Sequence, residues 1–350
     1  MTTSVQFFHA QRKMVFSYQI ALVALLIAAA VITLGYGPAG WDWRLAFAWL
    51  SPQSFEEFSQ LQLNVVTQIR LPRFCLAVLI GMALANTGAA TQALCRNPLA
   101  DPSIIGVSSG AAVMAVSAIA FAPALGFSAD AWLPYFAFVG ALVVTLIVYK
   151  LSMQGNQINV TTLILIGVAI NALCFALIGL VSFYADDSAL RLINYWTMGS
   201  LAGAGWSSLL KGLPLLLVAL VGLYLLREKI NLLLLGESEA RYLGIDIGRL
   251  KGQIVLLTAL GVGAAVSLTG LVGFVGLVVP HITRLLVGAN MSNMLLVCGL
   301  IGALMMLVAD WFARNLVTPA ELPIGIVTAM IGAPIFVYLL YRQQREHRHA

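Results

Sequence analysis

The chain has 350 residues, of which 61% are hydrophobic and only 9% are charged. An ordinary soluble domain carries about 25% charged residues, so the composition excludes a water-soluble globular protein and makes lipid the surroundings of most side chains. The net charge of +5 does not indicate nucleic-acid binding, because the basic residues stand singly between apolar runs and form no patch. They are better explained as determinants of membrane topology.

Apolar runs of membrane-spanning length recur along the chain. A helix needs ~20 apolar residues to cross ~30 Å of hydrocarbon, so this length holds about ten spans and no large soluble domain. The first run follows Arg12 and Lys13 without a small-residue cleavage site after it, which favours a span over a signal peptide. We predict one all-α polytopic domain over residues 1–350, with spans near 18–34, 74–94, 104–122, 134–149, 160–183, 209–226, 254–271, 272–287, 294–312 and 322–341.

The stretch from Ile254 to Val287 is continuous and apolar, but it is too long for a single span. Gly270, Gly273 and Gly276 offer a place for the chain to turn. We therefore divide this stretch into the seventh and eighth spans, with a turn between them.

Charge and tryptophan positions favour ten spans with both termini in the cytoplasm. The inner cations would then be Arg12, Lys13, Arg96, Lys150, Arg227, Lys229, Arg241, Arg249, Lys251, Arg284, Arg342, Arg345 and Arg348, and the outer ones Arg44, Arg70, Arg73, Arg191, Lys211 and Arg314. This excess of inner cations is the positive-inside bias. All seven tryptophans would lie at or beyond the outer ends of spans, as in an interfacial aromatic belt.

A faint internal repeat adds to the transporter-like pattern. Gly81, Ala83, Thr87, Gly88, Pro98 and Gly106 recur at one constant offset as Gly263, Ala265, Thr269, Gly270, Pro280 and Gly288. An odd number of spans separates the two copies, so a genuine repeat would be inverted, as it is in many transporters.

No residue pattern predicts catalysis or a metal site. The sequence has no H-E-x-x-H helix, no Ser-His-Asp set, and no metal-ligand spacing among its cysteines and histidines. No acid falls mid-span, which weakens a proton-coupled carrier; Asp310 comes nearest and is predicted to pair with Arg314. A nucleotide-binding G-x-x-x-x-G-K-[ST] loop is also missing, so any ATP used must be bound by another chain.

The longest inner loop runs from Arg227 to Lys251, between the sixth and seventh spans. Its leucines and mixed charges predict a short amphipathic helix pair that projects from the membrane. An ordinary interfacial loop is the alternative. Glu237 and Arg241 are four residues apart, so on a helix they would share one face.

Several stretches together resemble the FecCD-type permeases of type II ABC importers, which carry cobalamin, haem and ferric siderophores. The resemblance runs in order from about Arg70 to Leu340. The matching stretches are RLPR at 70–73, RNPLADP at 96–102, GVSSG at 106–110, YWTMG at 195–199, LGESEAR at 235–241, GFVGLVVPH at 273–281, ELPIG at 321–325 and GAP at 332–334.

The resemblance implies a type II ABC importer permease fold and a set of partners. Two copies of the permease would surround a central pathway in the bacterial inner membrane. Two cytoplasmic ATPase subunits would hold ATP and Mg²⁺, with no cofactor in this chain, and a periplasmic binding protein would deliver the ligand. The implied mechanism is alternating access, in which ATP-driven closure of the ATPases moves the permease gate.

The resemblance also implies roles for individual residues. Arg70, Arg73 and Arg314 match outer arginines that receive acidic residues of the binding protein; single interfacial arginines on solvated helix ends are the alternative. Five loop residues match the coupling helices that sit in a cleft of the ATPase, namely Gly236, Glu237, Ala240, Arg241 and Gly244. Val160 and Thr161 match the cytoplasmic gate, although Val160 departs from the small hydroxyl residues usual there, and Asn171 is a candidate pathway residue.

The nature of the cargo stays open at this stage. An iron complex, haem or a ferric siderophore, is expected because most members of the family carry iron, and cobalamin is the alternative. Two other classes of protein are compatible with the composition, a secondary carrier built from inverted repeats and a structural or assembly membrane protein. The missing mid-membrane acid disfavours the carrier, and the ordered set of motifs disfavours both. We therefore expect a transport subunit rather than an enzyme.

Overall fold

A computed structural model describes residues 2–37, 40–47, 58–126, 128–155, 157–317 and 319–349. Helices dominate these ranges, as expected of a chain whose backbone polar groups must be satisfied within lipid. The long helices are α1 (Thr2–Gly35), α4 (Leu71–Cys95), α5 (Val107–Leu125), α6 (Ala129–Leu151), α7 (Val160–Tyr184), α9 (Trp206–Leu235), α11 (Ile247–Thr269), α13 (Met291–Asn315) and α14 (Ile324–His349). The helix α12 (Val275–Val287) is shorter.

Short elements connect these helices. They are η1 (Trp43–Ala46), α3 (Gln60–Asn64), the π-helix η2 (Val65–Arg70), η3 (Pro102–Ile105), α8 (Asp187–Thr197) and α10 (Glu237–Tyr242). Two small antiparallel hairpins complete the structure: β1 (Tyr36–Gly37) pairs with β2 (Gly40–Trp41), and β3 (Met153–Gln154) pairs with β4 (Gln157–Ile158).

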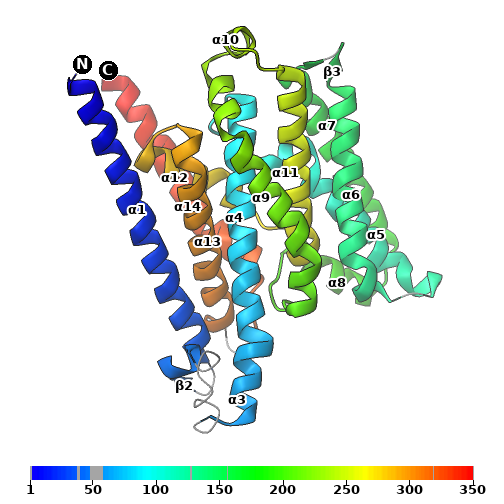
Figure 1. Cartoon of the computed structure of the whole chain (residues 1–350). Helices are drawn as coiled ribbons and strands as arrows, with labels where there is room; N and C mark the ends of the chain where they lie inside the picture. The colour runs from blue at the N-terminus through cyan, green and yellow to red at the C-terminus, as the bar shows by residue number, and fades with distance from the viewer. Residues whose placement is uncertain are drawn as a thin grey trace.

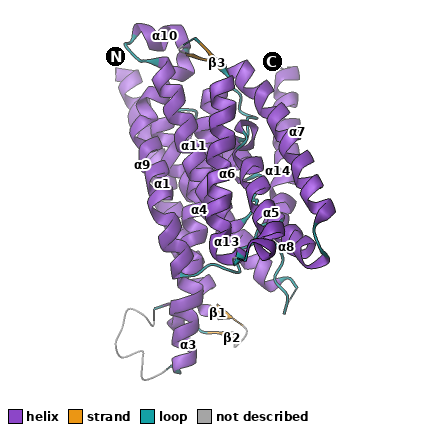
Figure 2. Cartoon of the chain, turned by 90° about the vertical axis from the view of Figure 1, so that its right-hand side faces the viewer, coloured by secondary structure: helices purple, strands orange, loops and turns teal. Residues whose placement is uncertain are grey.

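Both termini lie at the same end of the bundle as α10, whereas α3 and the β1–β2 hairpin lie at the opposite end (Figures 1 and 2). We name these the α10 end and the α3 end. Within the described ranges, seven helices are long and apolar enough to cross a membrane. Three shorter apolar helices, Val107–Ala122, Val275–Val287 and Ile324–Leu339, bring the total to about the ten predicted. The predicted all-α polytopic fold is therefore confirmed.

The chain turns in the middle of the ambiguous stretch, as the sequence indicated. Helix α11 ends at Thr269, where Gly270 adopts a φ of 71°, and α12 begins at Val275. The eighth span nevertheless differs from the prediction. At 1.5 Å per residue, α12 is only about 20 Å long, shorter than the hydrocarbon core. It begins inside the bundle and rises toward the α10 end (Figure 1).

The predicted loop 227–251 is mostly helical, which corrects both its extent and its form. Helix α9 continues past the charged residues to Leu235, because Ile230 and Leu233 remain buried and no glycine or proline interrupts the chain before Gly236. Helix α11 begins at Ile247, capped by Asp246, whose side chain accepts from Arg249 N. Between them stands α10 alone, rather than a pair of helices.

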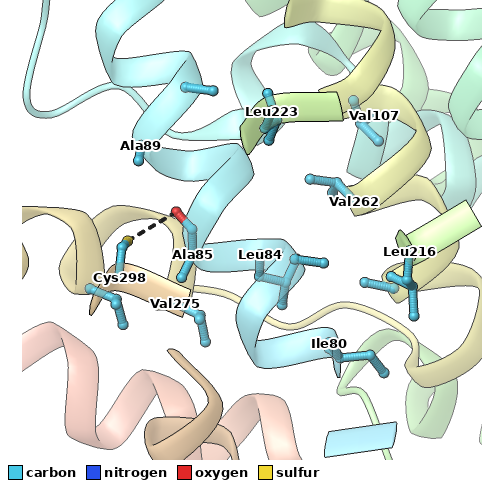
Figure 3. Packing of buried hydrophobic residues seen from close by; sticks show 14 of the residues in the cluster. Ile80, Leu84, Ala85, Ala89, Val107, Leu216, Leu223, Val262, Val275 and Cys298 are labelled. Carbon is cyan, nitrogen blue, oxygen red and sulfur yellow. Dashed lines mark hydrogen bonds between the residues drawn. The ribbon is translucent and has the colours of Figure 1, made fainter. Parts of the chain in front are cut away.

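Helix α4 passes through the centre of the bundle and packs against α9, α11, α12 and α13. Small residues allow these close approaches. A Cβ on Gly81 would overlap the backbone of Gly302 on α13, and one on Gly88 would overlap Gly276 on α12. Figure 3 shows Ile80, Leu84, Ala85 and Ala89 of α4 among side chains from α5, α9, α11, α12 and α13.

Of the predicted inverted repeat, the structure supports only the opposite directions of the two matched helices (Figure 1). Helices α4 and α11 run in opposite senses through the bundle (Figure 1), as an inverted pair requires. The matched glycines are not equivalent, however, since Gly88 lies inside α4 whereas Gly270 ends α11.

The arrangement predicts which loops face each side of a membrane. Ala289, before α13, and Ala320, after it, are both exposed and lie at opposite ends of that helix. We expect Ala289→Cys to react with an impermeant maleimide only from the cytoplasmic side, and Ala320→Cys only from the outside. The opposite labelling pattern would contradict two separate crossings by α11 and α12 or reverse the predicted orientation, and labelling of both from one side would contradict a membrane-crossing α13.

Candidate functional site

The three predicted docking arginines lie at the α3 end, and two of them belong to a network of ion pairs. The Arg73 guanidinium donates to Asp310 Oδ1 through Nε at 2.9 Å and to both Glu321 oxygens, at 3.0 and 2.9 Å. Arg314 Nε lies 3.1 Å from Asp310 Oδ2, which is the pairing predicted from the sequence. We call Arg73, Asp310, Arg314 and Glu321 the ion-pair network.

Three of the four side chains in the ion-pair network are withdrawn from the surface, whereas that of Glu321 is 35% exposed. The side chains of Arg73 and Asp310 are 7% and 3% exposed, and that of Arg314 is 17% exposed. Two cations and two carboxylates balance in charge, so the network joins α4, α13 and the segment before α14 without a net charge. Arg73 is thus occupied by internal partners, a structural role that the sequence pattern did not indicate.

Arg70 lies at the end of the π-helix η2 and is half-buried. Its Nη1 donates to Leu34 O of α1 at 2.7 Å, which ties η2 to the first helix. The docking role of the three arginines stays a prediction, with Arg70 and Arg314 the members that remain partly accessible.

At the α10 end, α10 carries the predicted coupling residues. Gly236 precedes it with a φ of 148°, and the Glu239 carboxylate occupies the space that a Cβ at Gly236 would take. Gly244 follows it with a φ of 82°. Both glycines adopt backbone conformations that other residues enter only with strain, so the turns on either side of α10 depend on them.

The charges of α10 match the direction of its dipole. Glu237 and Glu239 stand in its first turn and Arg241 in its last. The pKa of Glu239 is lowered by its own backbone N–H and then by the Ser238 hydroxyl, which donates to it at 3.0 Å. Ala240 is fully buried and fixes this short helix to the bundle.

Glu237 and Arg241 do not pair with each other along α10. Arg241 Nη2 donates to Gln157 Oε1 of β4 at 3.1 Å, and Glu237 Oε1 accepts from Lys251 Nζ of α11 at 2.8 Å. Lys251 Nζ also donates to Ile158 O of β4 at 2.9 Å. The predicted coupling residues therefore reach the β3–β4 hairpin directly and through Lys251.

The predicted gate residues begin α7, directly after that hairpin. Asn159 caps the helix, its side chain accepting from Thr162 N at 3.0 Å. Val160 and Thr161 line a polar cavity of about 330 Å³ together with Glu237 and Lys251. Tertiary structure thus brings the predicted gate residues and Glu237 of the predicted coupling set, which come from separate stretches of the chain, to a single cavity.

Asn171 lies farther along α7 and uses its amide within the bundle. Its Nδ2 donates to Ser103 O of η3 at 3.1 Å, and its Oδ1 accepts from the Ser109 hydroxyl of α5. The side chain therefore binds α7 to its neighbours. Its role in lining a pathway stays a prediction.

Sequence reasoning missed Lys251 and the carboxylates around Arg73. A signal for Lys251 was present, because it falls on the helical stripe of Ile247, Ile254 and Thr258, all buried. A cation on an apolar stripe is a candidate for a buried ion pair. No such signal linked Arg73 with Glu321, which lies 248 residues away.

Comparisons with known proteins decide the family. The model of the FecCD transport family matches residues 25–342. This chain belongs to the FecCD transport family. The haemin transport permease HmuU of Yersinia pestis is 41% identical, over 92% of this chain and 95% of its own length. The vitamin B12 import permease BtuC of Vibrio cholerae is 40% identical, over 92% of each chain.

A solved structure agrees in fold. A protein described as a metal-chelate type ABC transporter, in an inward-facing conformation, superposes with a TM-score of 0.80 at 36% identity. The alignment covers 93% of this chain and 98% of that one. As a FecCD family member, the chain is the permease subunit of an ABC importer in the inner membrane, and ATP hydrolysis takes place on a separate chain. Membership also implies an ATPase and a substrate-binding protein as partners.

The ion-pair network predicts a large difference between two arginine substitutions at the α3 end. Arg73→Met removes a buried cation from the buried Asp310 carboxylate and from Glu321, and we expect it to lower the free energy of unfolding by about 3–5 kcal/mol. Arg44→Met is the matched control, because the Arg44 side chain is 58% exposed beside Asp42 and an exposed pair contributes about 0–1 kcal/mol. Thermal unfolding in detergent measures both. Equal stability of the two variants would contradict a structural role for Arg73.

Proposed function

We propose that this permease imports an iron complex, with haem as the leading candidate. The observation that supports this cargo is the 41% identity to a haemin permease across nearly the whole of both chains, together with the expectation that most of the family carries iron. Cobalamin is the second candidate, supported by the 40% identity to BtuC. Two copies of the chain would form the pathway between them, with α7 and α14 supplying the walls.

The apolar faces of α7 and α14 support this arrangement. Leu165, Phe175 and Phe183 of α7 are each more than half exposed, as are Met330 and Val337 of α14. Such faces suit contact with lipid or with a second copy. A pathway lined by apolar side chains suits a large ligand because such walls bind it only weakly and let it pass. The binding protein would supply the affinity.

The partner ATPase would drive conformational change in the permease through a contact at the α10 end. No nucleotide-binding loop occurs in the sequence, so the free energy of ATP hydrolysis must be transmitted to this chain through contact with another protein. The helix α10 suits that contact because it projects from the bundle (Figure 2) and exposes Ser238, Glu239 and Arg241. The gate at Val160 and Thr161 lies beside it, around the same cavity. This proposal makes the α10 end cytoplasmic, together with both termini.

The cargo is tested by transport in proteoliposomes that contain the permease, its partner ATPase and the binding protein. We expect ATP-dependent uptake of haemin and no uptake when the ATPase lacks its catalytic carboxylate. Uptake of cobalamin alone would replace haem by the second candidate. Uptake that continues with the inactive ATPase would contradict an ATP-driven importer and favour a secondary carrier.

Docking of the binding protein is proposed at Arg70 and Arg314, with Arg73 as their buried support. Both side chains remain partly accessible, and charges at an interface steer encounter and fix orientation. We expect the Arg70→Gln, Arg314→Gln double variant to insert normally but to bind the loaded binding protein roughly tenfold more weakly, in the upper range of two surface ion pairs. Arg191→Gln on α8, an exposed arginine at the same end, is the control. Unchanged affinity of the double variant would remove the docking proposal.

A further inference from the structure

Lys251 is almost completely buried, although it lies only five residues into α11. Its side chain is 3% exposed. A charged ammonium in such a site is stable only when its donors are bound, and the structure supplies two acceptors, Glu237 Oε1 at 2.8 Å and Ile158 O at 2.9 Å. These acceptors belong to two other elements, α10 and β4. One ammonium group therefore joins three segments of the chain.

The two acceptors stand beside the residues that the proposed mechanism has to connect. Glu237 is the first residue of α10, the element proposed to contact the ATPase. Ile158 is separated from the first residue of α7, Val160, only by the capping Asn159. Two hydrogen bonds donated by Lys251 Nζ therefore connect the proposed ATPase contact on α10 with the predicted gate at the start of α7.

We propose that Lys251 is a positioning residue that transmits displacement of α10 to the first turn of α7. The inference rests on the proposed function, since it takes α10 as the contact with the ATPase. When the ATPase moves α10, Glu237 moves with it. Glu237 is the only counter-charge of Lys251 among the residues that the structure describes. Removing a buried cation from such a partner is strongly unfavourable, so the Lys251 ammonium follows Glu237. Ile158 O and the start of α7 are then carried along.

A second contact also joins α10 to the β3–β4 hairpin, but it is exposed to solvent. Arg241 Nη2 donates to Gln157 Oε1 between exposed side chains. An exposed hydrogen bond can be exchanged for water at little cost, so it cannot hold the hairpin to α10 during a displacement. The buried contact at Lys251 has no such alternative. The polar cavity beside it, lined by Thr161 and Gln154 among others, gives the start of α7 room to move.

The test uses the intact transporter with two reporter cysteines, introduced one at a time. Ser238→Cys reports the α10 surface, and Thr161→Cys reports the gate; both positions are exposed. The rate of maleimide labelling is measured with and without ATP, and the chain without a reporter sets the background from its native cysteines. Each reporter is combined with Lys251→Met, which keeps the length and apolar stem of the side chain but removes its charge.

Arg249→Met is the matched control, because Arg249 lies two residues away on the same helix, with an 86% exposed side chain paired to Asp246. In the parent and in the control, we expect ATP to change labelling at both reporters. In Lys251→Met, we expect the change at Ser238→Cys to persist and the change at Thr161→Cys to fall roughly tenfold or more, within the range typical of coupling between sites. Uptake should fall in parallel.

An ATP response at both reporters in Lys251→Met would overturn the inference and leave the proposed function standing. An ATP response at neither reporter in the parent would overturn the coupling role of α10, and the inference with it. If Lys251→Met does not accumulate in the membrane, Glu237→Gln replaces it as the test variant. Glutamine keeps an acceptor oxygen for Lys251 but removes the counter-charge. The substituted side chain is only half-buried, at the first residue of α10. The same loss at Thr161→Cys alone is expected, and a full response there would overturn the inference.

Discussion

The close approach of backbones around α4 is the constraint on which the rest of the bundle depends. Lipid offers little hydrophobic drive for helix association, so packing contacts and small residues hold membrane helices together. Gly81 faces Gly302 of α13, and Gly88 faces Gly276 of α12. These contacts place α12 and α13 against a single central helix. They leave the side chains of α1, α7 and much of α9 facing outward, where large apolar residues are exposed.

The charged residues that do lie within this packed structure occur at its two ends. At the α3 end, the ion-pair network joins α4, α13 and the segment before α14. At the α10 end, Lys251 joins α10, α11 and β4. Buried ion pairs of this kind add little stability compared with apolar packing, but they are costly to break. They suit positions where elements must keep their relative placement while the surrounding helices move.

This division matches the work of an ABC importer permease. Such a subunit binds partners on both faces of the membrane and holds no nucleotide itself. The α10 end combines turns that depend on glycine, an exposed short helix and a polar cavity at the start of α7. In the proposed mechanism, a displacement applied to α10 reaches α7 through the contacts of Lys251 with Glu237 and Ile158. In the centre of the bundle, by contrast, the buried hydroxyls of Thr87 and Thr91 donate to carbonyls of their own helix, so they keep their partners when helices shift.

The sequence alone determined the class of the protein, the number of spans and the family, because these depend on local composition, on hydrophobic run length and on motifs that are contiguous in the chain. It also indicated the turn between α11 and α12 from three glycines, and the pairing of Asp310 with Arg314, which are one helical turn apart. It predicted the coupling and gate residues in two separate stretches but gave no sign that these stretches meet.

Tertiary structure alone decided the contacts between distant segments, since these depend on which helix faces meet. The pairing of Arg73 with Glu321, the use of the Asn171 amide between α5 and α7, and the capture of Lys251 by Glu237 and Ile158 are all of this kind. Tertiary structure also set the limits of the helices. The charges at Arg227–Lys229 resemble the end of a span, yet buried residues on the next two turns continue α9 to Leu235, because packing outweighs local polarity.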